Sequence, residues 1–488
     1  MPDATTTDDA AAPPVALTEA VWTDGDQRAQ LAELGLEIPS YDRSRLRPRV
    51  VHIGVGGFHR AHLALYLDHL ARTTDSDWGI RGIGLLPGDA AMRDALAAQD
   101  HLYTFTMKGT GVRTTEVVGS IIDYVLAADD TAPAAAAIAD AETAIVSMTV
   151  TEAGYTDEPL NQRTFDVIAE GLAARCDAGL GGVTVMSCDN LPGNGEAAER
   201  CVLDACRRRS RQLADWVAAE CRFPNSMVDR ITPQTAEADR AHLRDTFGLD
   251  DRWPVVGEPF WQWVLEDDFA AGRPDFAAVG ALYTDDVHAW ELYKLRILNS
   301  GHSCIAYLSA LAGITYVDEA LADPTISAFL SRLLHTEAVP TLTEIPGHPR
   351  EDYAAVVIER FANTGVRDQI ARLCIDGTSK FPTFLMPTIA GNLLADGPLE
   401  CAALALAGWA HYLSDVPLDE QSHDAAGDAS RPRATAAAAG DPAVFCDDNP
   451  AFPADIAGSD RFRAAFAAAH TAITELGPHA AVEALLAD

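Results

Sequence analysis

Residues 49–71 read RVVHIGVGGFHRAHLALYLDHLA and set the expected architecture of the first half of the chain. The apolar run after Arg49 predicts a buried strand, and glycines follow it directly. Leu63, Leu67 and Leu70 then recur at the spacing of one helix face. A strand, a glycine turn and a helix in this order are typical of the opening unit of a dinucleotide-binding domain, where the backbone approaches a pyrophosphate closely.

The glycine turn carries the candidate cofactor residues Gly54, Gly56, Gly57 and Phe58. Small residues there let a cofactor reach the free N–H groups at the start of a helix. The third glycine of the usual fingerprint is missing, because Phe58 and His59 stand in its place. A plain strand-to-helix turn is therefore the alternative interpretation.

A second strand is predicted over 79–86, and Asp89 follows it. An acid at this point binds the ribose hydroxyls of the adenosine and repels a 2′-phosphate. Because Arg93 is the first cation after the strand, we expect NAD rather than NADP. The alternative is that Asp89 is the N-cap of a helix over 90–99.

Further buried strands are predicted over 144–149 and 183–188, and strands that alternate with helices predict a mostly parallel sheet. From Thr284 to about Leu413 the chain has helical periodicity almost throughout. With 488 residues, two domains are expected. We therefore predict an α/β protein with an N-terminal Rossmann-type domain over 21–284 and a mostly α-helical C-terminal domain over 285–488.

Two segments have the composition of unfolded chain. Residues 1–20 are acidic and rich in Ala and Pro, which predicts a disordered tail. Residues 416–442 are of low complexity, which predicts a flexible insertion. We expect this insertion to contact nothing catalytic.

The strand over 183–188 ends in Asp189, Asn190 and a Pro/Gly-rich loop. Ligands of open α/β sheets bind beyond the carboxyl ends of the strands, which makes Asn190 a candidate site residue. Asp, Asn, Pro and Gly also form turns, so a structural turn is an equal alternative.

Residues 290–303, WELYKLRILNSGHS, predict a helix that opens the second half. The polar residues Glu291, Lys294, Asn299 and His302 need packing or a function on the faces that the leucines leave. Residues three or four apart are neighbours on a helix. We therefore treat these four residues as one candidate group.

Lysine is scarce in this chain, because only Lys108, Lys294 and Lys380 occur among 36 Lys and Arg residues. Arginine does not lose its proton in a protein, whereas a desolvated lysine does so and can act as a base. We therefore favour a chemical role for Lys294 beside Asn299 and His302. The alternative is a helix with Lys294 facing water and His302 hydrogen-bonded in the core.

The formal net charge is −36, which argues against nucleic acid or anionic lipid as a partner, because both need a basic surface. Many acids with few lysines suit concentrated salt, and we infer a halophilic source.

Nine scattered cysteines without a C-x-x-C pair indicate reduced thiols. The acids at the N-terminus are not typical of a signal peptide, so we expect none, and no apolar run is long enough to span a membrane. We therefore expect a cytoplasmic protein. His59 and His62 are the only close histidine pair and lack a nearby cysteine, so we expect no metal site.

Seven ordered motifs carry a resemblance to a known family: IGVGGFHRAH, TVTEAGY, VMSCDNLPGNG, MVDRITP, EPFWQWVLED, KLRILNSGH and DGTSKFP. Together they resemble the polyol-specific long-chain dehydrogenases, of the mannitol 2-dehydrogenase and fructuronate reductase type. The resemblance covers roughly residues 30 to 415 and the final helix.

The resemblance implies metal-independent hydride transfer in a cleft between a Rossmann-type domain and a helical domain. It implies Lys294 as the general base, with Asn190 and Asn299 donating hydrogen bonds to the substrate oxygen. It also implies that Glu291 lies on the proton's route to water and that the substrate is held by His302, Asp229, Arg372 and Lys380. Oxidation of a secondary alcohol needs such a base and such donors when no metal is present.

We therefore expect an NAD-dependent enzyme that interconverts a polyol and a ketose, with mannitol and fructose first, acting as a monomer. The alternatives within the family are a fructuronate reductase and a D-arabinitol dehydrogenase. A protein that binds a dinucleotide without turnover is the alternative from another class.

Overall fold

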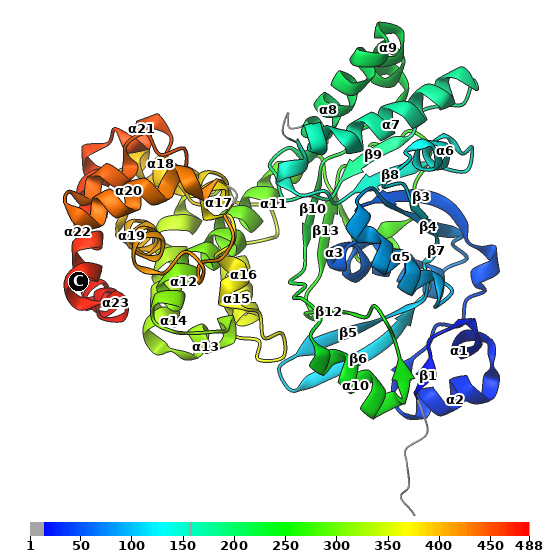
Figure 1. Cartoon of the computed structure of the whole chain (residues 1–488), viewed down its shortest axis with the longest axis horizontal. Coiled ribbons are helices and arrows are strands. Elements are labelled where there is room, and N and C mark those ends of the chain that lie inside the picture. Colours follow the sequence, from blue (N-terminus) through cyan, green and yellow to red (C-terminus); the bar gives the residue numbers. More distant parts are fainter. Residues whose placement is uncertain (1–13, 156–158, 425, 488) are drawn as a thin grey trace, which may run out of the picture. The chain divides into compact units, whose positions relative to one another are not determined.

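The structure is a computed structural model that describes residues 14–155, 159–424 and 426–487 (Figure 1). The chain divides into two compact units near Asp285. The second unit begins at Asp286 and also includes the short segments Gly109–Gly111 and Asn190–Pro192. The predicted fold class, a Rossmann-type domain followed by a helical domain, is confirmed.

The centre of the first unit is a five-stranded sheet in which every pairing is parallel. Its strands lie in the order β7-β4-β3-β8-β9. From the central β3, the chain adds β4 and then β7 on one side, and later β8 and β9 on the other side. This is the strand order of a dinucleotide-binding sheet, and the order reverses between the parallel neighbours β3 and β8. The bounds are β3 (Arg47–Ile53), β4 (Trp78–Gly84), β7 (Ile121–Leu126), β8 (Ile145–Met148) and β9 (Thr184–Ser187).

Helices cover both faces of this sheet. Val51 and Ile53 of β3 pack with α6, α7, α8 and α9, whereas Val50 packs with α4 and α5. Successive strand residues point to opposite faces, so a strand buried on both sides reads as one apolar run. The bounds are α4 (Leu63–Thr73), α5 (Ala90–Ala97), α6 (Ala132–Ala139), α7 (Pro159–Asp177), α8 (Asn194–Arg209) and α9 (Arg211–Glu220).

Smaller sheets complete the first unit, in the orders β12-β5-β6-β2, β10-β13-β14 and β1-β11. These strands are β1 (Val15–Ala16), β2 (Leu36–Glu37), β5 (Tyr103–Gly109), β6 (Val112–Val118), β10 (Ser226–Asp229), β11 (Leu249–Asp250), β12 (Val255–Gly257), β13 (Gln262–Leu265) and β14 (Leu282–Tyr283). The remaining helices of the unit are α1 (Glu19–Thr23), α2 (Gly25–Glu33), α3 (Gly57–Ala61) and α10 (Glu237–Phe247).

Ordered structure begins earlier than the expected boundary at residue 20. Strand β1 pairs with β11, and α1 starts at Glu19. Residues 1–13 of the predicted tail lie outside the described residues.

The second unit is helical and contains one long helical run, α11 (Val287–Tyr293), the π-helical turn Lys294–Asn299 and α12 (Ser300–Leu311). Helix α19 (Glu400–Asp415) is buried from Cys401 to Leu413, because α12, α20 and α22 pack around it. A helix that is enclosed in this way must be apolar on all sides. The other helices are α13 (Val317–Ala322), α14 (Pro324–Arg332), α15 (Arg350–Phe361), α16 (Ile370–Leu373), α17 (Gly377–Phe384), α18 (Met386–Ala395), α20 (Gly427–Ala439), α21 (Ala454–Ala457), α22 (Asp460–Leu476) and α23 (Pro478–Ala487).

The segment 416–442, expected to be a flexible insertion, differs from that expectation. It contains α20, whose residues Ser430, Ala434 and Ala437 are buried. The alanines that give the segment its low complexity are also the strongest helix formers. Composition alone therefore did not separate a flexible loop from a helix here.

In the described part of the chain, no helix is long and apolar enough to cross a lipid bilayer. All nine cysteines are free thiols, and only Cys176 is not fully buried.

Candidate active site

The glycine turn after β3 is tied to the end of β8. Gly54 has a φ of +88°, and a Cβ atom there would lie 2.2 Å from the carbonyl oxygen of Thr149. The hydroxyl of Thr149 donates a hydrogen bond of 2.8 Å to the carbonyl of Gly54. Only glycine fits this position, and the turn is fixed where the strand order reverses.

The next two glycines are not required by the packing of the protein. A Cβ atom at Gly56 or Gly57 would meet nothing closer than 3.7 Å. Glycine there leaves backbone exposed for close approach of a ligand, as a dinucleotide pyrophosphate requires. The turn therefore fits such a cofactor.

Asp89 lies at the end of β4, where an acid that binds ribose is expected. A Cβ atom on Gly84 would lie 2.7 Å from the Asp89 Cβ, so the two residues are in close contact. The Asp89 carboxylate accepts a hydrogen bond of 2.9 Å from the amide of Leu86. Asp89 occupies the N-cap position of α5 but makes no side-chain hydrogen bond to that helix.

Aromatic rings pack beside the glycine turn. Phe58 stacks on His62 with ring centroids 5.0 Å apart, and His52 stacks on His59 at 3.4 Å. The His52 ring contacts the hydroxyls of Ser147 at 2.8 Å and Thr149 at 3.1 Å. Burial lowers the pKa of His59 well below its ordinary value.

Among the residues that the structure describes, no group of three or more His, Cys, Asp or Glu side chains is arranged to hold a metal ion.

In the second unit, the side chains of Lys294 and Asn190 form a hydrogen bond. The Lys294 Nζ donates a short hydrogen bond to Asn190 Oδ1, and Lys294 is 7% exposed. Asn190 follows β9 in the chain but belongs to the second unit. Two motifs that the sequence placed far apart are therefore in direct contact.

Lys294 and Asn299 begin and end the π-helical turn. Its i→i+5 bonding places residues five apart about one turn from each other, and such turns are frequent at functional sites. Glu291, one α-helical turn before Lys294, is buried and contacts the exposed His288 at 3.4 Å. Asn299 Oδ1 is buried and has no hydrogen-bond partner among the described residues.

His302 lies next to cations of the same unit. Its ring stacks on Phe361 with centroids 3.8 Å apart, and burial and the charges of Arg372, Arg360 and Lys380 lower its pKa well below its ordinary value. Its Nε2 atom is buried without a hydrogen-bond partner in the described part of the chain. The ring is therefore neutral at ordinary pH.

Two short helices carry Arg372 and Lys380, the cations that are expected to contact the substrate. Arg372 of α16 is paired with Asp368, which accepts from its Nε at 2.7 Å. Lys380 of α17 donates to the carbonyl of Leu373 at 3.3 Å. Both helices therefore hold their cations in defined positions.

Asp229 and the glycine turn belong to the first unit. Asp229 ends β10, is 1% exposed and stands opposite Gln262 in the antiparallel pairing with β13. It thus lies at the end of a strand of the smaller sheet β10-β13-β14 and not in the five-stranded parallel sheet.

The sequence did not single out Arg360 or Phe361, which both lie at His302. Arg360 is one of many arginines in the chain, so the argument from the small number of lysines does not apply to it. The position of Phe361 on α15, four residues after the buried Val357, is that of an ordinary core residue.

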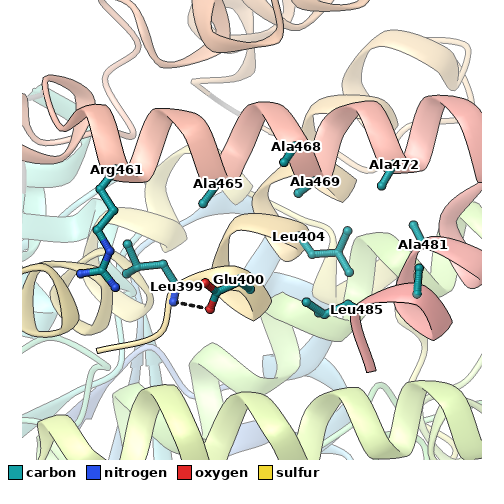
Figure 2. Close-up of a pocket in the computed structure, with 11 residues that line it drawn as sticks. Leu399, Glu400, Leu404, Arg461, Ala465, Ala468, Ala469, Ala472, Ala481 and Leu485 are labelled. Carbon is teal, nitrogen blue, oxygen red and sulfur yellow. Dashed lines mark hydrogen bonds between the residues drawn. The ribbon is translucent and has the colours of Figure 1, made fainter. Parts of the chain in front are cut away.

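A pocket of about 480 Å³ lies elsewhere in the second unit, among α19, α22 and α23 (Figure 2). Alanines of α22 face Leu404 of α19 across it, and Glu400 caps the amide of Leu399 at one end. None of the predicted site residues lines this pocket.

Known proteins match almost the whole chain. The family description mannitol dehydrogenase Rossmann domain matches residues 48–278, and mannitol dehydrogenase C-terminal domain matches residues 286–474. The mannitol 2-dehydrogenase of Neosartorya fischeri is 43% identical over 418 residues, which are 80% of this chain and 83% of that protein.

Two solved structures are similar over nearly their full length. The Pseudomonas fluorescens mannitol 2-dehydrogenase, in a ternary complex with NAD and D-mannitol, has a TM-score of 0.87 and 35% identity, covering 97% of this chain and 100% of that one. A D-sorbitol dehydrogenase in substrate-free form has a TM-score of 0.80 and 34% identity, covering 92% and 97%. The chain belongs to the mannitol dehydrogenase family.

Proposed function

We propose that this protein is an NAD-dependent dehydrogenase that interconverts D-mannitol and D-fructose, with Lys294 as the general base. The observation that carries the proposal is the buried contact between Lys294 and Asn190, next to the π-helical turn that ends at Asn299. The similarity to enzymes named for mannitol supports the substrate.

The glycine turn and Asp89 are the residues that would hold NAD, and bound NAD supplies the acceptor for the hydride of the alcohol carbon. Gly54, Gly56 and Gly57 keep side chains away from the backbone at this turn. Asp89 would accept hydrogen bonds from ribose hydroxyls, and its charge would repel a 2′-phosphate. The NAD complex of the Pseudomonas fluorescens enzyme supports this choice of cofactor.

Lys294 takes the hydroxyl proton while the carbon loses its hydride. One N–H of the amine is committed to Asn190 Oδ1, so the nitrogen is held in one direction. A neutral amine in that position still has a lone pair for the proton. A base that is placed in this way contributes roughly a hundredfold or more to the rate.

The two asparagines stabilise the developing negative charge. Because Asn190 Oδ1 accepts from Lys294, its NH₂ group remains to donate toward the substrate oxygen. The NH₂ group of Asn299 donates to the same oxygen. Donors that are fixed before the reaction are worth about a hundredfold each.

Glu291 then passes the proton from Lys294 toward water. It is buried one helical turn before the lysine, and the exposed His288 lies 3.4 Å from its carboxylate. This order of groups gives the proton an outward route.

Neutral polar atoms suit a polyol. Asn299 Oδ1 and His302 Nε2 are buried without hydrogen-bond partners among the described residues. Hydroxyl groups of the substrate would be their partners, because a hydroxyl both donates and accepts. Arg372 and Lys380 would bind hydroxyls farther from the reacting carbon.

A substrate panel with purified protein tests the proposal. D-mannitol, D-sorbitol and D-arabinitol are offered with NAD or NADP, and D-fructose and D-fructuronate with NADH or NADPH. We expect the highest kcat/KM for D-mannitol with NAD and for D-fructose with NADH. The cations beside His302 would also suit a carboxylate, so strong reduction of fructuronate without activity on mannitol or fructose would reject the proposal.

We also propose a monomeric, cytoplasmic protein, and sedimentation of the purified enzyme tests its oligomeric state. The halophilic source finds no support in the comparisons and stays a prediction from composition, which the salt dependence of activity tests.

A further inference from the structure

We propose that Asp424 is a positioning residue that anchors the helix of Lys380, so that the segment 416–442 helps to determine how tightly the polyol binds. This inference rests on the proposed function, because it takes Lys380 and Arg372 as residues that bind the substrate. The helices α16 and α17 carry these two cations.

The N-terminus of α17 is capped from a distant part of the chain. Its own N-cap residue, Asp376, has a φ of +55° and makes no side-chain capping bond. Asp424 Oδ2 instead accepts from the Thr378 amide at 3.0 Å and from the Thr378 hydroxyl at 2.9 Å, across 46 residues of sequence. An N-terminal amide of the helix is thus satisfied by a buried carboxylate, which is 8% exposed.

Neighbours of Asp424 hold the same two helices. The carbonyl of His423 accepts from the Asp376 amide at 2.9 Å, and the hydroxyl of Ser422 donates to the Ala371 carbonyl of α16 at 2.7 Å. The hydroxyl of Ser430, in α20, lies 3.1 Å from that of Thr378. Together with the two bonds of Asp424, five hydrogen bonds from this segment therefore reach α16 and the start of α17, three of them to backbone atoms and two to the Thr378 hydroxyl.

Asp424 is itself fixed by the start of α20. Its Oδ1 atom accepts from the Ala426 amide at 3.2 Å, so one carboxylate joins the starts of α17 and α20. Direct packing also holds this helix start in place, because a Cβ atom on Gly377 would lie 2.1 Å from the Tyr307 hydroxyl. The start of α17 has no room to shift toward α12.

Asp424 would affect the substrate site through Lys380, which lies two residues after Thr378. Its ammonium donates to the Leu373 carbonyl and, with Arg372, acts electrostatically on His302. Loosening the start of α17 would move a cation that binds the substrate but does not react. Such a change weakens binding of the ground state and the transition state alike, so KM rises while kcat is kept.

The experiment compares Asp424→Asn with the matched control Asp428→Asn, which removes the same charge from an exposed side chain of α20. KM for the polyol, kcat, KM for NAD and hydrogen exchange of peptides covering 370–384 are measured, with the polyol that the wild type oxidises best. We expect Asp424→Asn to raise KM for the polyol about tenfold with kcat within about twofold, since hydrogen bonds to a charged group are lost. Exchange over 370–384 should become faster, and the control should match the wild type.

A purely structural role would lower the melting temperature and the active fraction but leave KM unchanged. An unchanged polyol KM in active Asp424→Asn therefore overturns the inference. Lys380→Met, tested in parallel, separates the two proposals: a raised KM there with none in Asp424→Asn refutes the anchor alone, and no rise in Lys380→Met refutes both the anchor and the assigned role of Lys380.

If Asp424→Asn does not fold, Thr378→Val replaces it, because this variant loses the hydroxyl bonds and keeps the backbone bond. We expect its polyol KM to rise about threefold. An unchanged KM in this variant also overturns the inference.

Discussion

The Nζ atom of Lys294 donates a hydrogen bond to Oδ1 of Asn190, which lies 104 positions earlier in the chain. The bond connects the start of a π-helical turn with the loop that follows β9. It orients both side chains at once, because one N–H of the amine points to Asn190 Oδ1 and the amide keeps its NH₂ group for another acceptor.

Lys294→Ala should abolish turnover while NADH still binds, because the base is lost and the glycine turn is unchanged. We expect kcat to fall about a hundredfold or more, measured as initial rates, with the Kd for NADH from fluorescence within about twofold. Arg211→Ala, which truncates an exposed cation of α9, is the control and should leave both values unchanged. Near-normal turnover of Lys294→Ala would refute the assignment of the base.

Asn190→Ala should lower kcat about 10- to 100-fold, and its effect should not add to that of Lys294→Ala. Residues in direct contact show interaction free energies of about 0.5–3 kcal/mol in double-mutant cycles. A cycle of the two single variants and the double variant measures this energy from kcat/KM. Additive losses would mean that the two side chains act independently.

Gly54→Ala should destabilise the protein and weaken NADH binding. Its φ of +88° costs a non-glycine residue about 1–2 kcal/mol, and its Cβ would lie 2.2 Å from the Thr149 carbonyl oxygen. Thermal melting and NADH titration measure the two effects. Gly25→Ala is the control, since a Cβ there meets nothing within 4 Å; equal behaviour of the two variants would contradict the proposed turn geometry.

Stability should fall as the pH falls from 6.5 toward 4, and His470 should cause part of this loss. Burial and the neighbouring His411 lower the pKa of His470 to about 4, while Asp415 opposes the shift. The ordinary pKa is about 6.5, so the unfolded chain binds the proton first as the pH falls, and the folded state loses up to about 3 kcal/mol.

His470→Phe should lose about 2 kcal/mol less stability than the wild type between pH 7 and pH 4.5, since phenylalanine keeps a ring and binds no proton. Urea unfolding at both pH values measures the difference. His348→Phe, at an exposed histidine, is the control. Identical pH dependence in the wild type and His470→Phe would rule out His470 as a source of the loss.

Chelation should leave activity intact. In the described residues no three His, Cys, Asp or Glu side chains are arranged as metal ligands, and Lys294 with the two asparagines replaces a metal in the proposed chemistry. The measurement is turnover of D-mannitol after prolonged dialysis against EDTA. A loss that zinc restores would contradict this prediction.

The sequence by itself determined those features that depend on residues near one another in the chain. The strand, glycine turn and apolar helix spacing over 49–71 predicted the Rossmann-type unit. The burial of each element shows in a hydrophobic pattern that spans only a few residues. Lysine scarcity drew attention to Lys294, and a strand end drew attention to Asn190. The same local reasoning did not foresee α20, because a run of alanines suits both an unfolded chain and a helix.

Only the tertiary structure decided which of these residues meet. On a regular α-helix, Lys294 and Asn299 would point about 140° apart, whereas the π-helical turn places them about one turn from each other. The contacts of Lys294 with Asn190, Thr149 with Gly54 and Asp424 with Thr378 join segments 104, 95 and 46 residues apart. Such contacts depend on strand order and on how helices pack, and no hydrophobic pattern along the chain shows either of these.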